Sequence, residues 1–147
     1  MDKQNFYDLN FDQLKNFLIE KVNVESNKAK MRAQQMFNAV YKKNIKNFDE
    51  LTTFSLDLRE KIKELISLAK PKIIDIQKSK DGTIKFLLEL KDKRNVETVL
   101  IPDKTQSRYT ICLSVSVGCY LSCEFCATAQ ISKKLVRNLS PGEIISQ

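Results

Sequence analysis

The first part of the chain carries apolar residues at intervals of three and four positions, the period of an amphipathic helix. Three such runs are present. The first follows Asn10, which forms a capping-box pattern with Gln13; the second starts near residues 26–27; the third follows Ser55 and is expected to stop at Pro71. The three predicted apolar faces are Phe11, Leu14, Phe17 and Leu18; Ala29, Ala33, Met36, Phe37, Val40 and Tyr41; and Leu58, Ile62, Leu65, Ile66 and Ala69.

After Pro71 the period changes to two, which predicts strands. The expected strands cover Lys72–Gln77, Thr83–Leu90 and Val96–Ile101, and Asp81-Gly82 is a typical hairpin turn between the first two. The segment Pro102–Ser107 is short and rich in turn-forming residues, so it is predicted to be a linker.

The last region begins with an alternating run, Tyr109–Val117, in which one face is apolar and the other is small and polar. This pattern favours a barrel strand whose outer face packs under helices while its inner face lines a site. The strand leads into a cysteine-containing loop, and barrel enzymes carry their chemistry at that end of the strands. Further on, Ser140 and Glu143 form a second capping-box pattern with Pro141 in the first turn, so a helix is predicted to start there.

Together these elements predict an α+β accessory domain, made of three helices and a β-meander, followed by the start of an α/β barrel. The expected boundaries are 1–70 for the helical region, 71–102 for the meander and 109–147 for the first barrel strand, the cysteine loop and the helix start. A barrel of this kind needs on the order of 200 residues, so only its beginning is expected in this chain.

Basic residues outnumber acidic ones, 25 to 18, and the net charge is +7 with no histidine. This balance favours a polyanionic partner such as RNA, although lysine-rich solvated helix faces produce the same excess. Met1–Asp12 contains no apolar signal-peptide core, and no stretch approaches the ~20 apolar residues that cross a bilayer. A cytoplasmic protein without a membrane partner is therefore expected, and cytoplasmic cysteines act as metal ligands or redox groups more often than as disulfides.

The most informative motif is Gly118-Cys119, followed by Cys123 and Cys126. Three thiolates in one loop can bind three irons of a [4Fe–4S] cubane and leave the fourth iron open for chemistry. A zinc site that recruits Cys112 is the alternative. Zinc cysteines normally form two close pairs, and Cys112 lies on a predicted strand without a close partner. The absence of histidine also excludes a site of three cysteines and one histidine, so the pattern favours the iron–sulfur cluster.

Several stretches together resemble one family, the RlmN-type dual-specificity adenine-C2 RNA methyltransferases of the radical S-adenosylmethionine (SAM) superfamily. The resemblance extends over nearly the whole chain, and the order and spacing of the stretches are specific. They are Lys28–Phe37, Tyr41–Lys43, Ser79–Thr83, Val96–Pro102, Thr110–Ser114, Val117–Cys119, Cys126–Ala129 and Arg137–Ile144.

The resemblance implies a radical SAM partial barrel that adds a methyl group to C2 of adenosine in 23S rRNA and tRNA. It implies a [4Fe–4S] cluster on Cys119, Cys123 and Cys126, with Phe125 as the aromatic residue that the superfamily often places between the last two cysteines. SAM would bind the open iron, and an electron donor would reduce the cluster to generate a 5′-deoxyadenosyl radical. The implied partners are therefore rRNA, tRNA and that electron donor.

The resemblance also assigns roles to two further residues. Glu97 matches the proton acceptor, and Cys112 matches the cysteine that resolves the covalent RNA adduct through a transient disulfide. Without the resemblance, Glu97 would be interpreted as an ordinary exposed strand carboxylate and Cys112 as a small buried hydrophobic residue. The helical region resembles the accessory domain that helps to engage RNA, and its candidate phosphate contacts are Lys28, Lys30, Arg32, Lys42 and Lys43, for which a solvated helix face is the alternative.

The sequence departs from the family pattern in two ways. The segment 127–136 is longer than expected and lacks a glycine often found there, and no cysteine follows Cys126 to carry the methyl group. A non-catalytic remnant or RNA-binding module is therefore the second hypothesis, and a zinc-binding module is the third. Methylation at C8 of adenine is an alternative outcome of the same chemistry.

Overall fold

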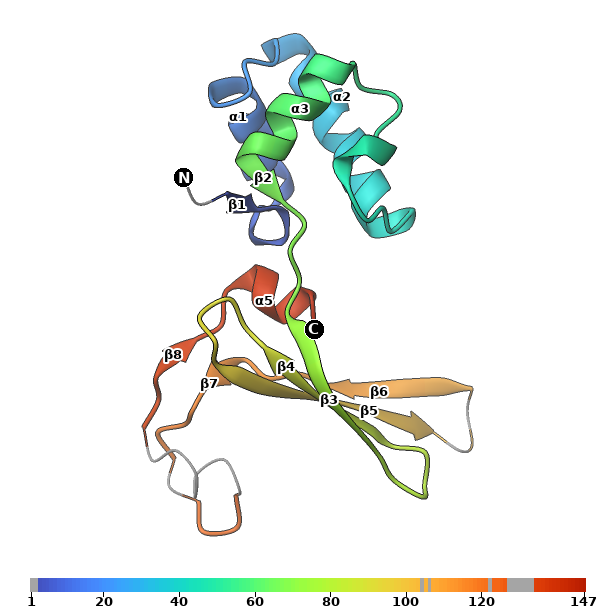
Figure 1. Ribbon diagram of the computed structural model, residues 1–147, viewed down its shortest axis with the longest axis vertical. Helices are drawn as coiled ribbons and strands as arrows, with labels where there is room; N and C mark the ends of the chain where they lie inside the picture. Colours follow the sequence, from blue (N-terminus) through green and yellow to red (C-terminus); the bar gives the residue numbers. More distant parts are fainter. Residues whose placement is uncertain (1–2, 104, 106, 122, 127–133) are drawn as a thin grey trace. The chain divides into compact units, whose positions relative to one another are not determined.

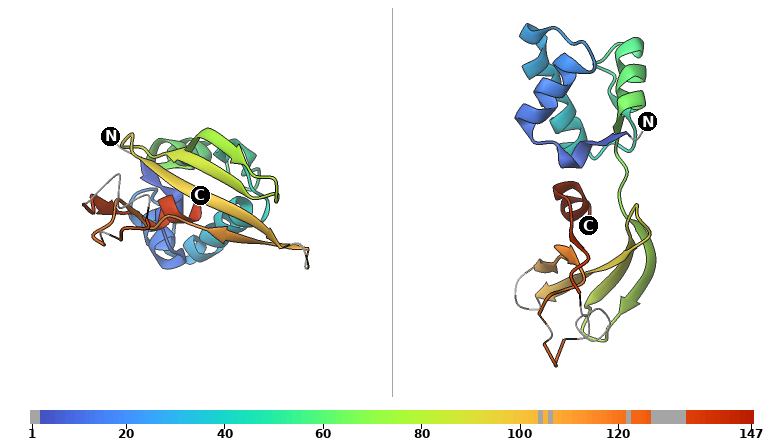
Figure 2. Two further views of the ribbon diagram at one scale, coloured as in Figure 1. Left: turned by 90° about the horizontal axis from the view of Figure 1, so that it is seen from below. Right: turned by 90° about the vertical axis from the view of Figure 1, so that its left-hand side faces the viewer.

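The computed structural model describes residues 3–103, 105, 107–121, 123–126 and 134–147 (Figure 1). The chain divides into two compact units, Met1–Ala69 and Lys70–Gln147, and each is described by itself. The first unit is mainly helical and the second is built around a β-sheet, so the chain is a mixed α/β protein (Figures 1 and 2).

The first unit consists of short strands, helices and single helical turns. In chain order they are strand β1 (Gln4–Asn5), a 3₁₀ turn (Phe6–Asp8), helix α1 (Phe11–Glu20), helix α2 (Ser26–Phe37), a π-helical turn (Asn38–Lys42), a second 3₁₀ turn (Phe48–Glu50), helix α3 (Leu56–Leu65) and strand β2 (Ile66–Ser67). Strands β1 and β2 pair in parallel.

The predicted helix starts are confirmed, but the end of the third helix is not. Asn10 and Gln13 form the complete capping box of α1, because each side chain accepts a hydrogen bond from the other's backbone N–H at 2.9 Å. Ser55 precedes α3 as expected, but its side chain makes no capping hydrogen bond. Helix α3 ends at Leu65, well before Pro71, because the next two residues pair with β1 as strand β2. Periodicity within the helix cannot reveal this distant pairing.

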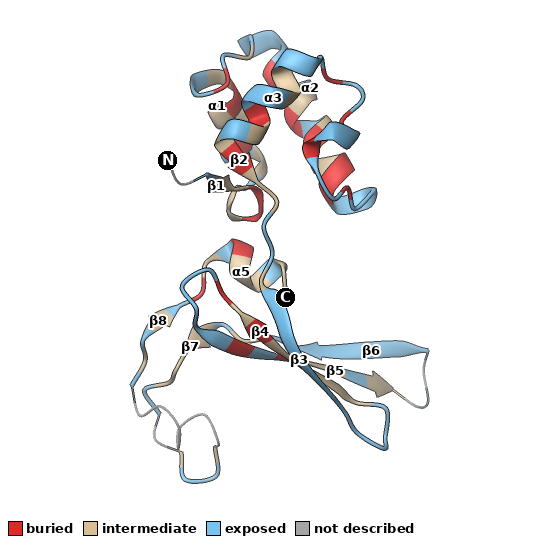
Figure 3. Cartoon of the chain, in the orientation of Figure 1, coloured by how far each residue is buried: buried red, intermediate tan, exposed pale blue. Residues whose placement is uncertain are grey.

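The inward faces of α1, α2 and α3 form the core of this unit (Figure 3). Its fully buried large side chains are Phe6, Leu14, Leu18, Met36, Ile62 and Ile66. Phe6 packs against Phe37 and Tyr41, with ring centroids 5.4 and 5.9 Å apart. Most of the predicted apolar positions are therefore buried in the core or packed against it. Phe6 and Phe48 are also core residues, although no helix was expected in their segments.

The second unit is organised around a four-stranded antiparallel sheet in the order β3-β4-β5-β6. Its elements are β3 (Lys72–Lys78), β4 (Ile84–Glu89), β5 (Asn95–Asp103), β6 (Arg108–Cys112), β7 (Ser116–Val117), β8 (Arg137–Asn138) and helix α5 (Pro141–Ile145). The predicted turn between β3 and β4 is confirmed. Gly82 adopts φ = 93°, a conformation that glycine enters without steric cost.

Two predictions for the region around β6 are wrong. The expected linker Pro102–Ser107 instead begins as the end of β5, and β5 pairs directly with β6. The expected single strand Tyr109–Val117 is divided into β6 and β7, because the backbone of Ser114 bonds to a side chain and not to a strand. Its N–H donates to Gln147 Oε1 at 3.0 Å, and its carbonyl accepts from Gln147 Nε2 at 2.8 Å.

A small core lies where α5 and β7 meet one face of the sheet. It consists of Leu88, Leu90, Val96 and Leu139, with Phe86, Val117 and Ile144 packed against them. The predicted helix start is confirmed, since Ser140 and Glu143 form a complete capping box. Apart from Val117, the apolar face predicted for Tyr109–Val117 is exposed instead, with Tyr109 63% and Val115 62% accessible. Within the described ranges, no helix combines the length and the hydropathy that crossing a membrane requires.

Candidate cluster loop and catalytic sheet face

The three motif cysteines lie in the loop that leaves β7 and returns to β8. Gly118 starts the loop with φ = 76°, which turns the chain immediately before the first cysteine. The Sγ atom of Cys119 accepts a hydrogen bond from the N–H of Leu121 at 3.4 Å, and the N–H of Cys126 donates to the carbonyl of Cys123 at 3.0 Å. All three cysteines are half-buried.

The loop does not hold the three thiols in a ligand cage. In the part of the chain that the structure describes, no three side chains of histidine, cysteine, aspartate or glutamate gather closely enough to hold a metal ion. The chemistry of the donor set nevertheless fits an iron–sulfur cluster, because thiolates are its usual ligands. Ligand cages of this kind often form only as the metal binds. Phe125 is 92% exposed. The sequence departs from the family pattern in the segment 127–136, and most of that segment is outside the described residues.

Glu97 and Cys112 lie on the same face of the sheet. Cys112 is directly opposite Val99 in the β5–β6 register, and Glu97 precedes Val99 by two positions on the same strand. Residues two apart on a strand share a face, and diagonal neighbours of this kind are about 7–8 Å apart. The structure thus brings together two candidates that are far apart in the sequence.

A third residue on this face, Lys85, was not identified from the sequence. It lies opposite Val99 on β4, and its Nζ atom is 3.0 Å from Oε1 of Glu97. Sequence reasoning missed Lys85 because the contact depends on the register between β4 and β5. The polar turn between these strands was the signal that could have set that register.

The environment of Cys112 differs from one of its two sequence-based interpretations. The residue is exposed, so it is not a small buried hydrophobic residue. None of the four cysteines forms a disulfide in the described part of the chain, so the disulfide implied for Cys112 has no support here. The nearby Ser114 Oγ donates to the carbonyl of Glu97 at 2.7 Å, which fixes the backbone beside both candidates.

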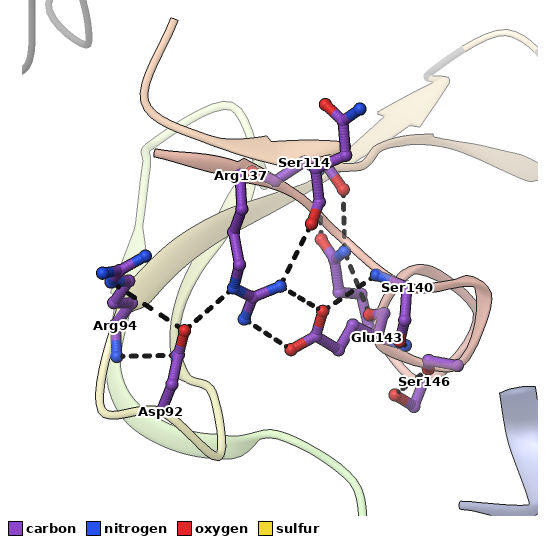
Figure 4. Close-up of polar contacts among 10 residues, drawn as sticks. Asp92, Arg94, Ser114, Arg137, Ser140, Glu143 and Ser146 are labelled. Atoms are coloured by element: carbon purple, nitrogen blue, oxygen red, sulfur yellow. Dashed lines mark hydrogen bonds and ion pairs between the residues drawn. The ribbon is translucent and has the colours of Figure 1, made fainter. Parts of the chain in front are cut away.

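A charged network lies where β8 meets α5 (Figure 4). Arg137 donates through Nε to Asp92 Oδ2 at 2.9 Å and binds Glu143 through both terminal nitrogens, at 2.7 and 2.8 Å. These hydrogen bonds lower the pKa of Glu143 and of Asp92 and raise the pKa of Arg137, so all three groups are charged at neutral pH. The sequence revealed Glu143 only as a helix cap, and no local pattern pointed to its pairing with Arg137.

The five candidate RNA contacts are in different environments. Lys28 pairs with Glu25 at 2.9 Å. The guanidinium of Arg32 donates to the carbonyl of Thr53 at 2.8 Å and lies 4.8 Å from the ring centre of Phe54, so it is already engaged within its own unit.

Lys30, Lys42 and Lys43 are exposed. Lys30 lines an open hollow of about 450 Å³ on α2, together with Asn27, Met31, Gln34 and Gln35. These three lysines are therefore exposed candidates that lie outside the ion pair of Lys28 and the contacts of Arg32.

Known proteins are similar to this chain in sequence and in fold. The family model of the ribosomal RNA large subunit methyltransferase N-terminal domain matches residues 4–68. Proteins named probable dual-specificity RNA methyltransferase RlmN from Staphylococcus aureus strains JH9 and Newman are each 41% identical over 146 residues, which is 99% of this chain and 38% of each relative. The crystal structure of a radical SAM methyltransferase from Sphaerobacter thermophilus matches with a TM-score of 0.80 and 31% identity, over 97% of this chain and 39% of that one. The chain therefore spans less than half the length of these relatives.

Proposed function

Since this chain is an RlmN-type sequence with the N-terminal domain of that family, we propose that it provides the RNA-engaging unit and the cluster loop of a radical SAM methyltransferase. The proposed reaction adds a methyl group to C2 of adenosine in 23S rRNA and tRNA. The observation that carries the proposal is the shared sheet face of Glu97 and Cys112, because it places the two residues matched to catalytic roles about 7–8 Å apart.

The proposed cofactors are a [4Fe–4S] cluster on Cys119, Cys123 and Cys126, and SAM. When bound and reduced by an electron donor, they supply a 5′-deoxyadenosyl radical. The chain's own contribution is the loop that presents three thiols, with Phe125 between the last two. Because Phe125 is almost fully exposed, its ring is available to cover a ligand in this loop.

Glu97 is the proposed proton acceptor for the adenine. A general base must reach the proton it removes and must be held in one orientation. The exposed carboxylate meets the first requirement, and the ion pair with Lys85 at 3.0 Å serves the second. Cys112 is the proposed resolving residue, and its exposure gives a covalently bound RNA access to the thiol.

One observation favours a second candidate function. Lys30, Lys42 and Lys43 of the first unit are exposed, as a non-catalytic RNA-binding module requires. Such a module would use the exposed lysines of the first unit and would need neither SAM nor iron. A zinc-binding module is less favoured, because Cys112 lies on the β6 strand and not in the loop.

Deleting the gene for this chain from its host is expected to remove 2-methyladenosine from 23S rRNA and tRNA. Mass spectrometry of RNA nucleosides measures the change, and re-expression of the wild-type gene should restore the nucleoside, whereas a Cys123→Ala gene should not. Unchanged 2-methyladenosine would favour the non-catalytic module. Loss of 8-methyladenosine instead would identify C8 as the methylated atom.

Neutralising Lys30, Lys42 and Lys43 together with glutamine is expected to weaken RNA binding. Each lost phosphate contact removes about 0.7 from the slope of log affinity against log salt for single-stranded RNA, so three contacts would remove about 2. Fluorescence anisotropy with a labelled tRNA at several salt concentrations measures the slope. In the control variant Lys15, Lys21 and Lys61 are replaced with glutamine, which removes the same charge and should change the slope less. Equal slopes in the two variants would disprove a localised contact.

A further inference from the structure

We propose that Arg137 is a positioning residue that holds the base of the cysteine loop, so that assembly and retention of the cluster depend on its contacts with Asp92 and Glu143. This inference rests on the proposed function, because it assumes that the loop binds an iron–sulfur cluster. It assigns a role to a charged network that none of the predicted site residues uses (Figure 4).

Arg137 lies at the point where the loop closes. Val117 and Arg137 are directly opposite each other in the β7–β8 pair, and Cys119 follows Val117 by two positions. The N–H of Val136 donates to the carbonyl of Val117 at 2.8 Å, which completes the neck of the loop. Each strand of this pair has only two residues, and such a short isolated pair is not stable by itself.

The side chain of Arg137 supplies the stabilisation that the short strands lack. It connects β8 to Asp92, in the turn between β4 and β5, and to Glu143, in the first turn of α5. The pairing with Glu143 is bidentate, and the two side chains are only 31% and 19% exposed. Bidentate arginine–carboxylate pairs in such partly buried places fix geometry better than exposed ion pairs do.

Glu143 is itself a rigid partner. Its Oε2 atom also accepts a hydrogen bond from the N–H of Ser140 at 2.9 Å, which closes the capping box of α5. The other end of the helix is anchored through Gln147, whose Oε1 atom accepts from the buried Thr98 at 2.8 Å. Arg137 therefore joins the neck of the loop to a capped helix whose C-terminal end is anchored to the sheet.

This arrangement has a specific consequence for the cysteines. The described loop residues do not preassemble a ligand cage, so three thiolates must be gathered as the cluster forms. A fixed neck limits the conformations that the loop can adopt and lowers the entropy cost of gathering them.

The test compares Arg137→Gln with the wild-type chain after anaerobic reconstitution with ferrous iron and sulfide. Bound iron and sulfide are measured, followed by the rate at which a chelator removes the iron. Arg137→Gln is expected to lose iron several-fold faster than wild type. The matched control is Arg108→Gln, which breaks the 3.1 Å pair with Asp103 at the β5–β6 hairpin and should leave the rate unchanged.

Circular dichroism establishes that each variant is folded before iron is added. If Arg137→Gln does not fold, Asp92→Asn, which leaves the pairing with Glu143 in place, is used for the same measurement. Iron retention equal to that of wild type in a folded variant would overturn the positioning role. A wild-type chain that takes up no iron would instead contradict the proposed cluster, and the inference would fail with it.

Discussion

Replacing Cys123 with alanine is expected to reduce the iron bound after anaerobic reconstitution from about four atoms per chain to background. Cys123 is the middle ligand of the proposed cluster, and two cysteines in a solvent-open loop cannot hold a cubane. Iron and sulfide analysis with the cluster's visible absorption measures the loss. The effect should be nearly complete, because the loop contains no histidine or additional cysteine to replace the missing thiol.

The matched control for this experiment is Cys112→Ala. Cys112 lies on β6, on the sheet face with Glu97, and not in the loop. The cluster hypothesis therefore predicts full iron binding in this variant, whereas a zinc site that uses Cys112 as its fourth ligand predicts impaired metal binding in both variants. Normal iron loading by Cys123→Ala would contradict the assignment of the ligands.

Replacing Met36 with alanine is expected to destabilise the helical unit by about 2–5 kcal/mol. Met36 is fully buried among α1, α2 and α3, so its truncation leaves a cavity in the core. Met31→Ala is an unusually close control, since Met31 is on the same helix but 49% exposed, and exposed substitutions usually change stability by less than about 0.5 kcal/mol.

Urea unfolding followed by circular dichroism at 222 nm measures both variants, because most of the helix content belongs to this unit. The midpoint for Met36→Ala should fall clearly below those of wild type and Met31→Ala. Equal destabilisation by the two substitutions would mean that the face of α2 that contains Met36 does not pack in the core.

The elements that could be predicted from the sequence are those specified by neighbouring residues. Asn10 and Gln13 define the start of α1 by bonding to each other's backbone, and the same holds for Ser140 and Glu143 at α5. The turn at Gly82 depends on one residue's backbone freedom. In each case the determining contacts are within four positions, so a local pattern contains the necessary information.

The predictions that were wrong depend on distant partners. Ile66 leaves the helical pattern because it pairs with Gln4 at the other end of the unit. The strand expected over Tyr109–Val117 is interrupted because Gln147 binds both backbone groups of Ser114. Alternating polarity predicts a strand conformation. It does not indicate which backbone N–H and C=O groups form hydrogen bonds with a neighbouring strand.

The candidate site also contains some features that neighbouring residues specify and others that depend on distant partners. The cysteine loop was predicted from spacing alone, since its candidate ligands are close in sequence. The roles of Glu97 and Cys112 came from the family resemblance, and only the strand register revealed that they share a face with Lys85. Arg137 could not be recognised at all, because its partners are 45 and 6 positions away in different elements.

The most direct test of the central claim is electron paramagnetic resonance of the reconstituted, reduced wild-type chain with and without SAM. The reduced chain is expected to give the signal of a [4Fe–4S] cluster, and this signal should change when SAM is added, because the iron without a cysteine ligand is open to it. A chain that binds zinc, or that shows no cluster signal after reconstitution, would contradict the claim that its cysteine loop is a radical SAM site.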